Sequence, residues 1–205
     1  MSEALLEETR AGPGRPSTGA RRRILDAGFV VLKRDGYAGL TTAKVAAEAG
    51  RNKALISYHF GGKQGLVAEV ARRVTSVITE DVRDAIAGAE DIEALGEAAL
   101  EAVWRLMERD EGIQRVYFDL TSQSVVDPEI QAMMAEMRAG FRSMLHERIK
   151  ELTSAASAAE IEAAAVFIIS GVEGLALERL DRGETAELAG ARRLWVSSLG
   201  AVLER

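Results

Sequence analysis

The amino-acid sequence predicts an all-α protein in which a small N-terminal three-helix domain precedes a larger helical C-terminal domain. Apolar residues recur at the spacing of amphipathic helices along almost the whole chain. No segment shows the sustained alternation of apolar and polar residues between hairpin turns that strands would show. No internal repeat of solenoid length is present. These observations predict helices packed around a core rather than a sheet or a repeat array.

The first helix is expected to follow a short N-terminal arm. Residues 1–19 contain several Gly and Pro residues, which disfavour a helix, and we predict that they form a flexible basic arm. From Ala20 onward an apolar face begins with Ile24 and Leu25. It ends at Gly36, which we predict to end the helix with a positive φ.

Two short helices are predicted next, and each has a polar residue placed to cap it. Thr41 precedes the segment 42–49, and Asn52 precedes the segment 53–60. The side-chain oxygens of Thr and Asn accept hydrogen bonds from the unpaired amides of a first helical turn. Both residues are therefore predicted N-caps.

The remaining helical patterns predict a second domain over residues 67–205, after a first domain over residues 20–66. Asp127 is placed to cap one of these helices, because Pro128 follows it at the position where helices favour proline. The predicted helices of this part are 63–86, 91–109, 113–124, 128–152, 158–180 and 185–203.

The composition excludes several classes of site. The chain has 205 residues, no Cys and two His residues far apart in sequence, so we expect no disulfide, no metal site and no cofactor. It contains no nucleophile elbow, phosphate-binding loop or HExxH motif, which argues against an enzyme. No apolar run approaches the roughly 20 residues of a membrane span. The acidic first residues do not resemble a signal peptide, so we expect a cytoplasmic protein.

Charge is distributed unevenly along the chain. The net charge is −6, which by itself argues against nucleic acid as a partner. Residues 10–63, however, hold 11 basic and 3 acidic residues, a net charge of +8. Residues 64–205 hold 15 basic and 26 acidic residues, a net charge of −11. Such asymmetry is typical of a nucleic-acid-binding segment attached to a body with another role, although a chance fluctuation is the alternative.

The two short helices and the turn between them meet the requirements of a helix-turn-helix. In that motif the second helix must protrude to enter the major groove of DNA. A helix as short as 53–60 is unstable alone, so we expect Ile56 and Phe60 to anchor it in the core. Its other side chains are then available to bases and phosphates.

This region resembles the DNA-binding domain of the TetR family of bacterial repressors. The resemblance covers about residues 18–70 and rests on many residues at fixed spacings. They are Ile24-Leu25-x-Ala27, Gly36-Tyr37, Leu40-Thr41-Thr42-x-x-Val45-Ala46-x-x-Ala49-Gly50 and His59-Phe60-x-x-Lys63-x-x-Leu66. The resemblance implies a dimer that binds DNA through this motif and responds to a small molecule through its C-terminal domain.

The chain departs from the family pattern at two places in the motif. Arg51 stands where the family usually has an apolar residue, and Ser57 stands where it usually has Tyr. The run 55–60 is closer to the betaine-responsive regulator branch of the family. Either Ser57 or Tyr58 could make the phosphate contact of the missing tyrosine, and we favour Tyr58 together with His59.

Lys63 is the residue for which the sequence gives the most specific phosphate-binding argument. Lys63 begins a helix, where the unpaired amides and the helix dipole attract an anion such as a DNA phosphate. A lysine at this position can bind the phosphate that those amides hold. A solvated lysine is the alternative. The basic arm, with Arg15, would reach the minor groove or backbone, or would simply be a solubilising tail. The predicted DNA-binding residues are Arg21, Arg22, Arg23, Thr41, Thr42, Asn52, Lys53, Ala54, Leu55, Ser57, Tyr58, His59 and Lys63.

The C-terminal domain has features of a dimerisation and ligand-binding body. The segment 163–180 is apolar around nearly its whole circumference, so it is buried on more than one side, either against a second subunit or within one chain. The predicted dimer-interface residues are Phe167, Gly171, Gly174, Leu175, Leu194, Trp195 and Leu199. Aromatic and Met residues gather in the middle of the chain, where they form a pocket or ordinary core. The predicted ligand-binding residues are Trp104, Met107, Tyr117, Phe118, Met133, Met137, Phe141 and Phe167.

We therefore expect a dimeric repressor that a small-molecule effector releases from a palindromic double-stranded DNA operator. A non-specific architectural DNA-binding protein is the alternative, and the sequence of the bound DNA distinguishes the two. We expect neither an enzymatic activity nor a membrane partner.

Overall fold

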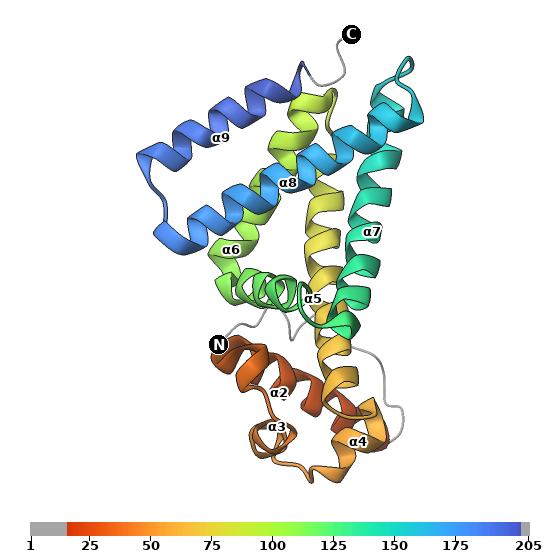
Figure 1. The fold of residues 1–205 in the computed structure, drawn as a ribbon, viewed down its shortest axis with the longest axis vertical. Helices are drawn as coiled ribbons and strands as arrows, with labels where there is room; N and C mark the ends of the chain where they lie inside the picture. The colour runs from red at the N-terminus through yellow and green to blue at the C-terminus, as the bar shows by residue number, and fades with distance from the viewer. Residues whose placement is uncertain (1–15, 202–205) are drawn as a thin grey trace. The chain divides into compact units, whose positions relative to one another are not determined.

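The computed structural model describes residues 16–201, and all regular structure in that range is helical. Figure 1 shows the helices in chain order. Their bounds are α2 (Pro16–Gly39), α3 (Thr42–Ala49), α4 (Ala54–Phe60), α5 (Lys63–Ile86), α6 (Ile92–Gln123), α7 (Pro128–Leu152), α8 (Ala158–Arg182) and α9 (Ala186–Leu199). The prediction of an all-α fold is confirmed. None of the described helices is both long enough and apolar enough to cross a membrane.

The chain divides into two compact units, and the division does not follow the order of the sequence. The first unit combines the residues up to Thr75 with Gly112–Met134, and the second combines Ser76–Glu111 with Ala135–Arg205. The predicted N-terminal domain, residues 20–66, lies within the first unit. Helices α5, α6 and α7 each contribute residues to both units.

The core of the first unit joins α2 to the two short helices and to the start of α5. Ile24 and Val31 of α2, Val45 of α3, Ile56 of α4 and Leu66 of α5 are all fully buried. Helix α2 packs on both α3 and α4. The burial of these five side chains supplies the tertiary support that helices as short as α3 and α4 require.

Helix α2 differs from its predicted bounds at both ends. It begins at Pro16 rather than at Ala20, because proline lacks an amide hydrogen and is tolerated in the first turn of a helix. Residues 1–15 of the predicted arm lie outside the described range. At the other end Gly36 takes the predicted positive φ of 68°, and helical structure resumes after it to Gly39.

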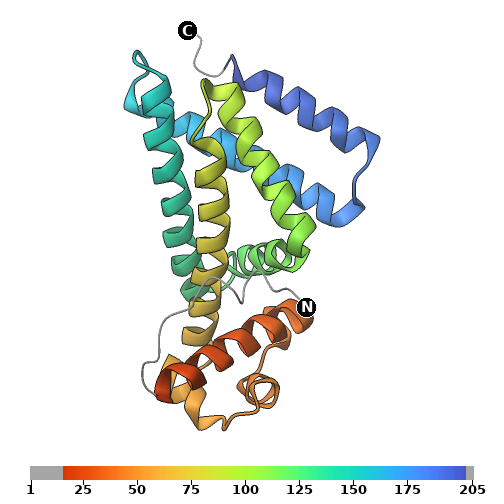
Figure 2. The same ribbon diagram turned by 180° about the vertical axis from the view of Figure 1, so that it is seen from behind.

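The second unit is built from long helices. The last turns of α5 run beside α7, as Figures 1 and 2 show, and α8 packs on α9. Its fully buried side chains include Leu95 of α6, Ile149 of α7 and Leu199 of α9. The sequence predicts two segments where the structure has α6, and the backbone does leave helical geometry between them, at Asp110 (φ −155°, ψ 90°).

Candidate functional site

The connection between α3 and α4 is a tight turn that hydrogen bonds fix. The Thr41 hydroxyl accepts from the Lys44 amide at 3.2 Å, which confirms Thr41 as an N-cap. Gly50 ends α3 in the left-handed conformation (φ 58°, ψ 41°), and the Arg51 amide donates to the Ala46 carbonyl at 3.0 Å. The Asn52 side chain then accepts from the Ala54 amide at 2.8 Å; α4 begins at Ala54 with Lys53 as its N-cap, one residue later than predicted.

Helix α4 has one buried side and one exposed side. Ile56 and Phe60 are buried, as predicted for the anchors of this short helix. Tyr58 is 79% exposed, an unusual degree for an aromatic side chain, and its ring meets the edge of His59 with centroids 4.9 Å apart. The other predicted contact residues of α4 and its approach are exposed (Asn52, Lys53, Ala54 and Ser57) or half-buried (Leu55 and His59).

Several basic side chains of the first unit are already paired with carboxylates. Lys44 contacts Asp35 at 2.9 Å, and Arg34 contacts both Asp35 and Glu48 at 3.0 Å. The hydrogen bonds from Arg34 and Lys44 lower the pKa of the Asp35 carboxyl. Part of the formal positive charge of this region is therefore compensated inside the protein.

The predicted DNA-binding residues outside α4 lie in varied surroundings. Arg21 pairs with Glu69 at 2.9 Å, and its guanidinium lies over the Phe60 ring at 5.1 Å from the centroid. Arg22 and Arg23 are exposed on α2. Thr41 is exposed and Thr42 is half-buried at the start of α3.

Lys63, at the start of α5, is engaged within the protein. Its ammonium donates to the Tyr37 carbonyl at 2.9 Å and lies 4.2 Å from the centroid of the Tyr37 ring. The side chain is half-buried. A lysine ammonium has three donors, so this contact leaves two for another acceptor.

Tyr37 is a connecting residue that sequence reasoning did not identify. Its amide donates to Asp119 Oδ2 at 2.6 Å, and its hydroxyl donates to Asp127 Oδ2 at 3.2 Å. Asp127 also accepts from the Glu129 amide at 2.9 Å, so it is the predicted N-cap of α7 as well as a partner of Tyr37. Tyr37 thus joins the last residues of α2 to α5, α6 and the start of α7 within the first unit. No local pattern relates residues so far apart in sequence.

The predicted dimer-interface residues separate into exposed and internal groups. Of these, Phe167 of α8 and Leu194 of α9 are exposed, at 41% and 74%; Val166 and Leu177 of α8, which the sequence did not predict, are exposed as well. We call these four residues the α8–α9 apolar face. Gly174 is exposed and has open space where a Cβ would lie, and Leu175 is half-buried.

Three other predicted interface residues pack within the chain. A Cβ on Gly171 would lie 1.9 Å from Trp195 Nε1, so the indole lies directly against the glycine backbone. Leu199 is fully buried, and a Cβ on Gly96 would lie 2.1 Å from its Cδ1. Gly171, Trp195 and Leu199 therefore hold α9 against α8 and α6.

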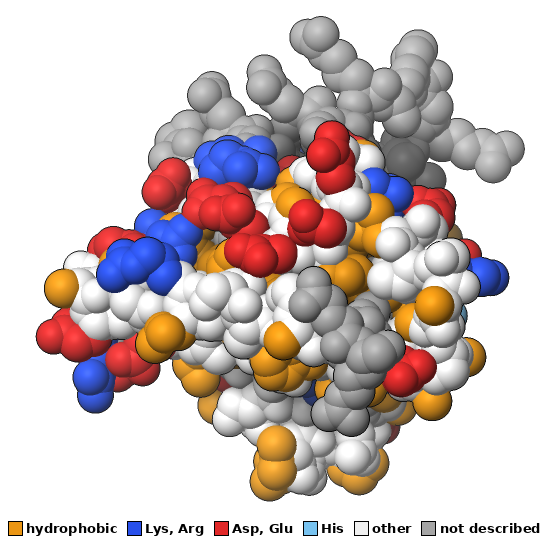
Figure 3. Space-filling model, turned by 90° about the horizontal axis from the view of Figure 1, so that it is seen from above, with side chains coloured by type: hydrophobic (Ala, Val, Ile, Leu, Met, Phe, Trp, Pro, Cys, Tyr) orange, Lys and Arg blue, Asp and Glu red, His pale blue; other side chains and the backbone are white. Residues whose placement is uncertain are grey.

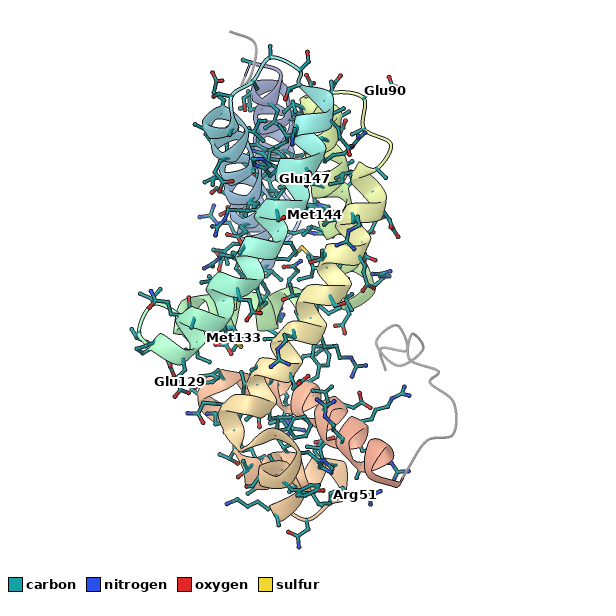
Figure 4. All side chains as sticks on the ribbon, turned by 90° about the vertical axis from the view of Figure 1, so that its right-hand side faces the viewer. Arg51, Glu90, Glu129, Met133, Met144 and Glu147 are labelled. Atoms are coloured by element: carbon teal, nitrogen blue, oxygen red, sulfur yellow. The ribbon has the colours of Figure 1, made fainter. Side chains whose placement is uncertain are left out.

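The predicted ligand-binding residues are mostly core residues and divide between the two units. Trp104, Met107, Met137 and Phe141 are buried in the second unit, where Phe167 is 41% exposed. Tyr117 is buried in the first unit, which also holds the half-buried Phe118 and Met133, the latter labelled in Figure 4.

Trp104 lies at the centre of a charged network in the second unit. The guanidinium groups of Arg192 and Arg179 lie 4.6 Å and 5.0 Å from the centroid of its ring. Its indole N–H donates to Glu184 at 3.1 Å. This network ties the end of α8 and the start of α9 to α6.

Two surface hollows are lined by described residues of the second unit. One, of about 650 Å³, has mixed charges from Asp81, Asp84, Arg105, Glu108 and Arg109. The other, of about 590 Å³, lies between α5 and α7 and includes Met144 and Glu147, both labelled in Figure 4. Figure 3 shows a face of the molecule on which acidic, basic and apolar side chains are interspersed. The described residues contain no group of His, Asp and Glu arranged to hold a metal ion.

A capped turn between two short helices, the second of which has an exposed polar side, defines a helix-turn-helix DNA-binding protein. Comparison with known families agrees with this class. Residues 24–70 match the family described as bacterial regulatory proteins, tetR family. Residues 92–204, more than half of the chain, match the family described as BetI-type transcriptional repressor, C-terminal.

The chain belongs to the TetR family of bacterial transcriptional regulators and has a BetI-type C-terminal domain. It is a transcriptional repressor of this family, not an enzyme. The predicted family, including the likeness to the betaine-responsive branch, is confirmed.

The individual proteins that resemble this chain share about a quarter of its residues over the matched regions. The nicotine-responsive transcriptional repressor HdnoR of Paenarthrobacter nicotinovorans is 25% identical over 91 residues, which are 44% of this chain and 47% of HdnoR, so the match spans about half of that relative. The transcriptional regulator BetI of Paraburkholderia phymatum is 23% identical over 85% of this chain and 88% of its own length. A solved structure of a transcriptional regulator from Pseudomonas aeruginosa is 26% identical, with a TM-score of 0.74 over 95% of this chain and 96% of its own.

Proposed function

We propose that this protein is a dimeric cytoplasmic repressor that binds a palindromic operator and is released by a small-molecule effector. The exposed side of α4 is the observation that carries the DNA-binding part of the proposal. Tyr58 is exposed beside Lys53 and Ser57, and all three can donate hydrogen bonds to phosphate. An aromatic side chain with so little protection from water gains burial when a DNA groove covers it.

The proposed DNA contacts are those that the sequence predicts. Tyr58 and Lys53 are central because Tyr58 is exposed on α4 and Lys53 is exposed directly before it. Lys63 contributes through the two donors that its bond to Tyr37 leaves available. Arg22 and Arg23 would reach the flanking backbone, together with the arm outside the described residues.

The α8–α9 apolar face supports the dimer. Exposed apolar side chains on one face are typical of protein interfaces, because water contact with such a face is unfavourable. The neighbouring Gly174 lacks a side chain, so a helix from a second subunit could approach closely there. Two α4 helices in such a dimer would meet two half-sites of a palindrome, and simultaneous binding would increase operator affinity.

The effector is proposed from the C-terminal domain type and from relatives. HdnoR is named as nicotine-responsive, and a structural neighbour at 20% identity is described as the multidrug-binding protein EbrR. We propose a small organic effector that enters among the predicted aromatic and Met residues. Because those of the second unit, such as Met107 and Met137, are now buried, binding requires side-chain rearrangement.

Selection of bound fragments from random DNA tests the proposal. We expect a palindrome with half-sites about one helical turn apart, and a footprint confined to it. Uniform coverage without a preferred sequence would instead support the architectural alternative. Sedimentation measurements then give the mass of the free and bound protein, and a screen of small organic molecules identifies those that release the selected duplex.

A further inference from the structure

Arg51 is a charged residue in the turn between α3 and α4. Its amide is fixed by the bond to the Ala46 carbonyl, the arrangement in which an apolar residue usually packs back on the preceding helix. Here the side chain is exposed, and Figure 4 shows it in the connection between α3 and α4. The charged group therefore projects from a turn whose backbone is held rigidly.

The guanidinium of Arg51 has a different kind of partner from those of Arg21 and Arg34. Arg21 and Arg34 each pair with a carboxylate. Arg51 donates at 3.2 Å to the carbonyl of the adjacent Gly50, a neutral acceptor. Binding an anion through Arg51 would therefore break no ion pair, whereas Arg21 and Arg34 would each have to exchange one.

Arg51 is also adjacent to the surface proposed to contact DNA. It is followed by the exposed Asn52 and Lys53, and the exposed side of α4 continues with Tyr58. A planar guanidinium binds phosphate through two parallel hydrogen bonds. Half or more of the hydrogen bonds between proteins and DNA go to the phosphate and sugar backbone, so a backbone phosphate is the expected partner of a guanidinium in this turn.

We propose that Arg51 binds a DNA backbone phosphate from the turn of the helix-turn-helix and adds a sequence-independent contact to the interface. This inference rests on the DNA-binding function and deepens it. Arg34 and Lys44 are already paired with carboxylates within the protein, and Arg51 would supply a positive charge to the DNA in addition to them.

The test is a salt series of binding measurements by fluorescence anisotropy, with a mixed-sequence duplex and with the selected operator. In Arg51→Gln we expect the slope of log affinity against log salt to fall by about 1 for both duplexes. Binding should weaken about five- to tenfold at ~0.1 M salt. Arg51→Lys should retain most of the slope because it keeps the charge.

Two further variants separate this role from a structural one. Arg51→Val restores the apolar type of residue common in the family, so it should keep or raise the melting temperature while losing the same slope as Arg51→Gln. Arg72→Gln is the matched control, because Arg72 is an exposed arginine of α5 that pairs with Glu69 at 2.6 Å. It should change the slope by much less.

If the wild type binds both duplexes and Arg51→Gln has an unchanged slope, the inference about Arg51 is overturned, but the proposed function is not. A loss confined to the selected operator would also overturn it, since that outcome indicates a base contact. If the wild type binds neither duplex, the proposed function itself fails.

Discussion

The exposed side of α4 and the α8–α9 apolar face both present large side chains to water, but their neighbours differ. Around Tyr58 the exposed residues include the hydrogen-bond donors Lys53 and Ser57. Close to Phe167 on α8 the exposed residues Val166 and Ser170 are apolar or small, whereas Leu194 follows the exposed Arg193 on α9. The first surface suits a charged, hydrated ligand, and the second suits another apolar surface. The exposure of a side chain therefore does not by itself indicate what kind of partner it binds. Exposure together with the presence of neighbouring hydrogen-bond donors does.

The largest expected effect comes from charging the α8–α9 apolar face. Phe167→Glu combined with Leu194→Glu should convert the proposed dimer to a monomer, because carboxylates would be buried without partners in its interface. Operator affinity should fall about 100-fold or more, since two linked heads no longer bind together. Sedimentation velocity and anisotropy with the selected operator measure both effects.

Val125→Glu provides the matched control for this variant. Val125 is 82% exposed, but it lies in the turn after α6 and not on the α8–α9 apolar face. It should leave the mass and the operator affinity unchanged. A doubly charged variant that remains a dimer would contradict the assignment of the face.

The second prediction separates two glycines of α8 that the sequence assigned to one interface. Gly171→Ala should lower the free energy of unfolding by about 1–3 kcal/mol, because its Cβ would overlap the Trp195 indole. Gly174→Ala meets open space in one subunit, so any loss should appear in dimer affinity instead. Urea unfolding at several protein concentrations separates the two effects; equal losses in both variants would show that the distinction is wrong.

The helix-turn-helix could be predicted closely because its signals are local. The cap at Thr41, the hydrogen bond that the Asn52 side chain accepts, the left-handed Gly50 and the anchors of α4 all follow from neighbouring residues. The contacts of Tyr37 with Asp119 and Asp127 join segments distant in sequence, and nothing in their spacing indicates them. For the same reason the sequence could not show that Gly171 and Leu199 pack within one chain, since a small or apolar residue suits a subunit interface equally well.

The third prediction concerns Lys63, which we expect to act in both folding and DNA binding. Lys63→Ala should lower the free energy of unfolding by about 1 kcal/mol through loss of the bond to the Tyr37 carbonyl. It should also reduce the salt slope by about 1 if one of its other donors holds a phosphate. Thermal melts and the salt series measure the two effects. A lower melting temperature with an unchanged slope would restrict Lys63 to an internal role, in contrast to Arg51.

The smallest expected effect tests Tyr37 through its hydroxyl. Tyr37→Phe should reduce the free energy of unfolding by about 0.5–1.5 kcal/mol, because Asp127 loses a donor while the ring stays over Lys63. Burial, followed by the negative charge of Asp127, raises the pKa of the Tyr37 hydroxyl above its ordinary value. The folded protein therefore holds this proton to higher pH than the unfolded chain, whose tyrosines titrate near pH ~10.

The contribution of Tyr37 is consequently complete below that pH and is lost as the pH rises through the raised pKa of the folded state. The difference in stability between wild type and Tyr37→Phe should be constant around neutral pH and should shrink in alkaline solution. Paired urea titrations across this range measure it, and because both proteins share every other titrating group, those contributions cancel. If the stability difference stays constant into strongly alkaline solution, the contribution of the hydroxyl does not depend on its protonation. In that case the hydroxyl does not donate to Asp127. The loss would then come from the space that the missing hydroxyl oxygen leaves, since the ring is present in both proteins.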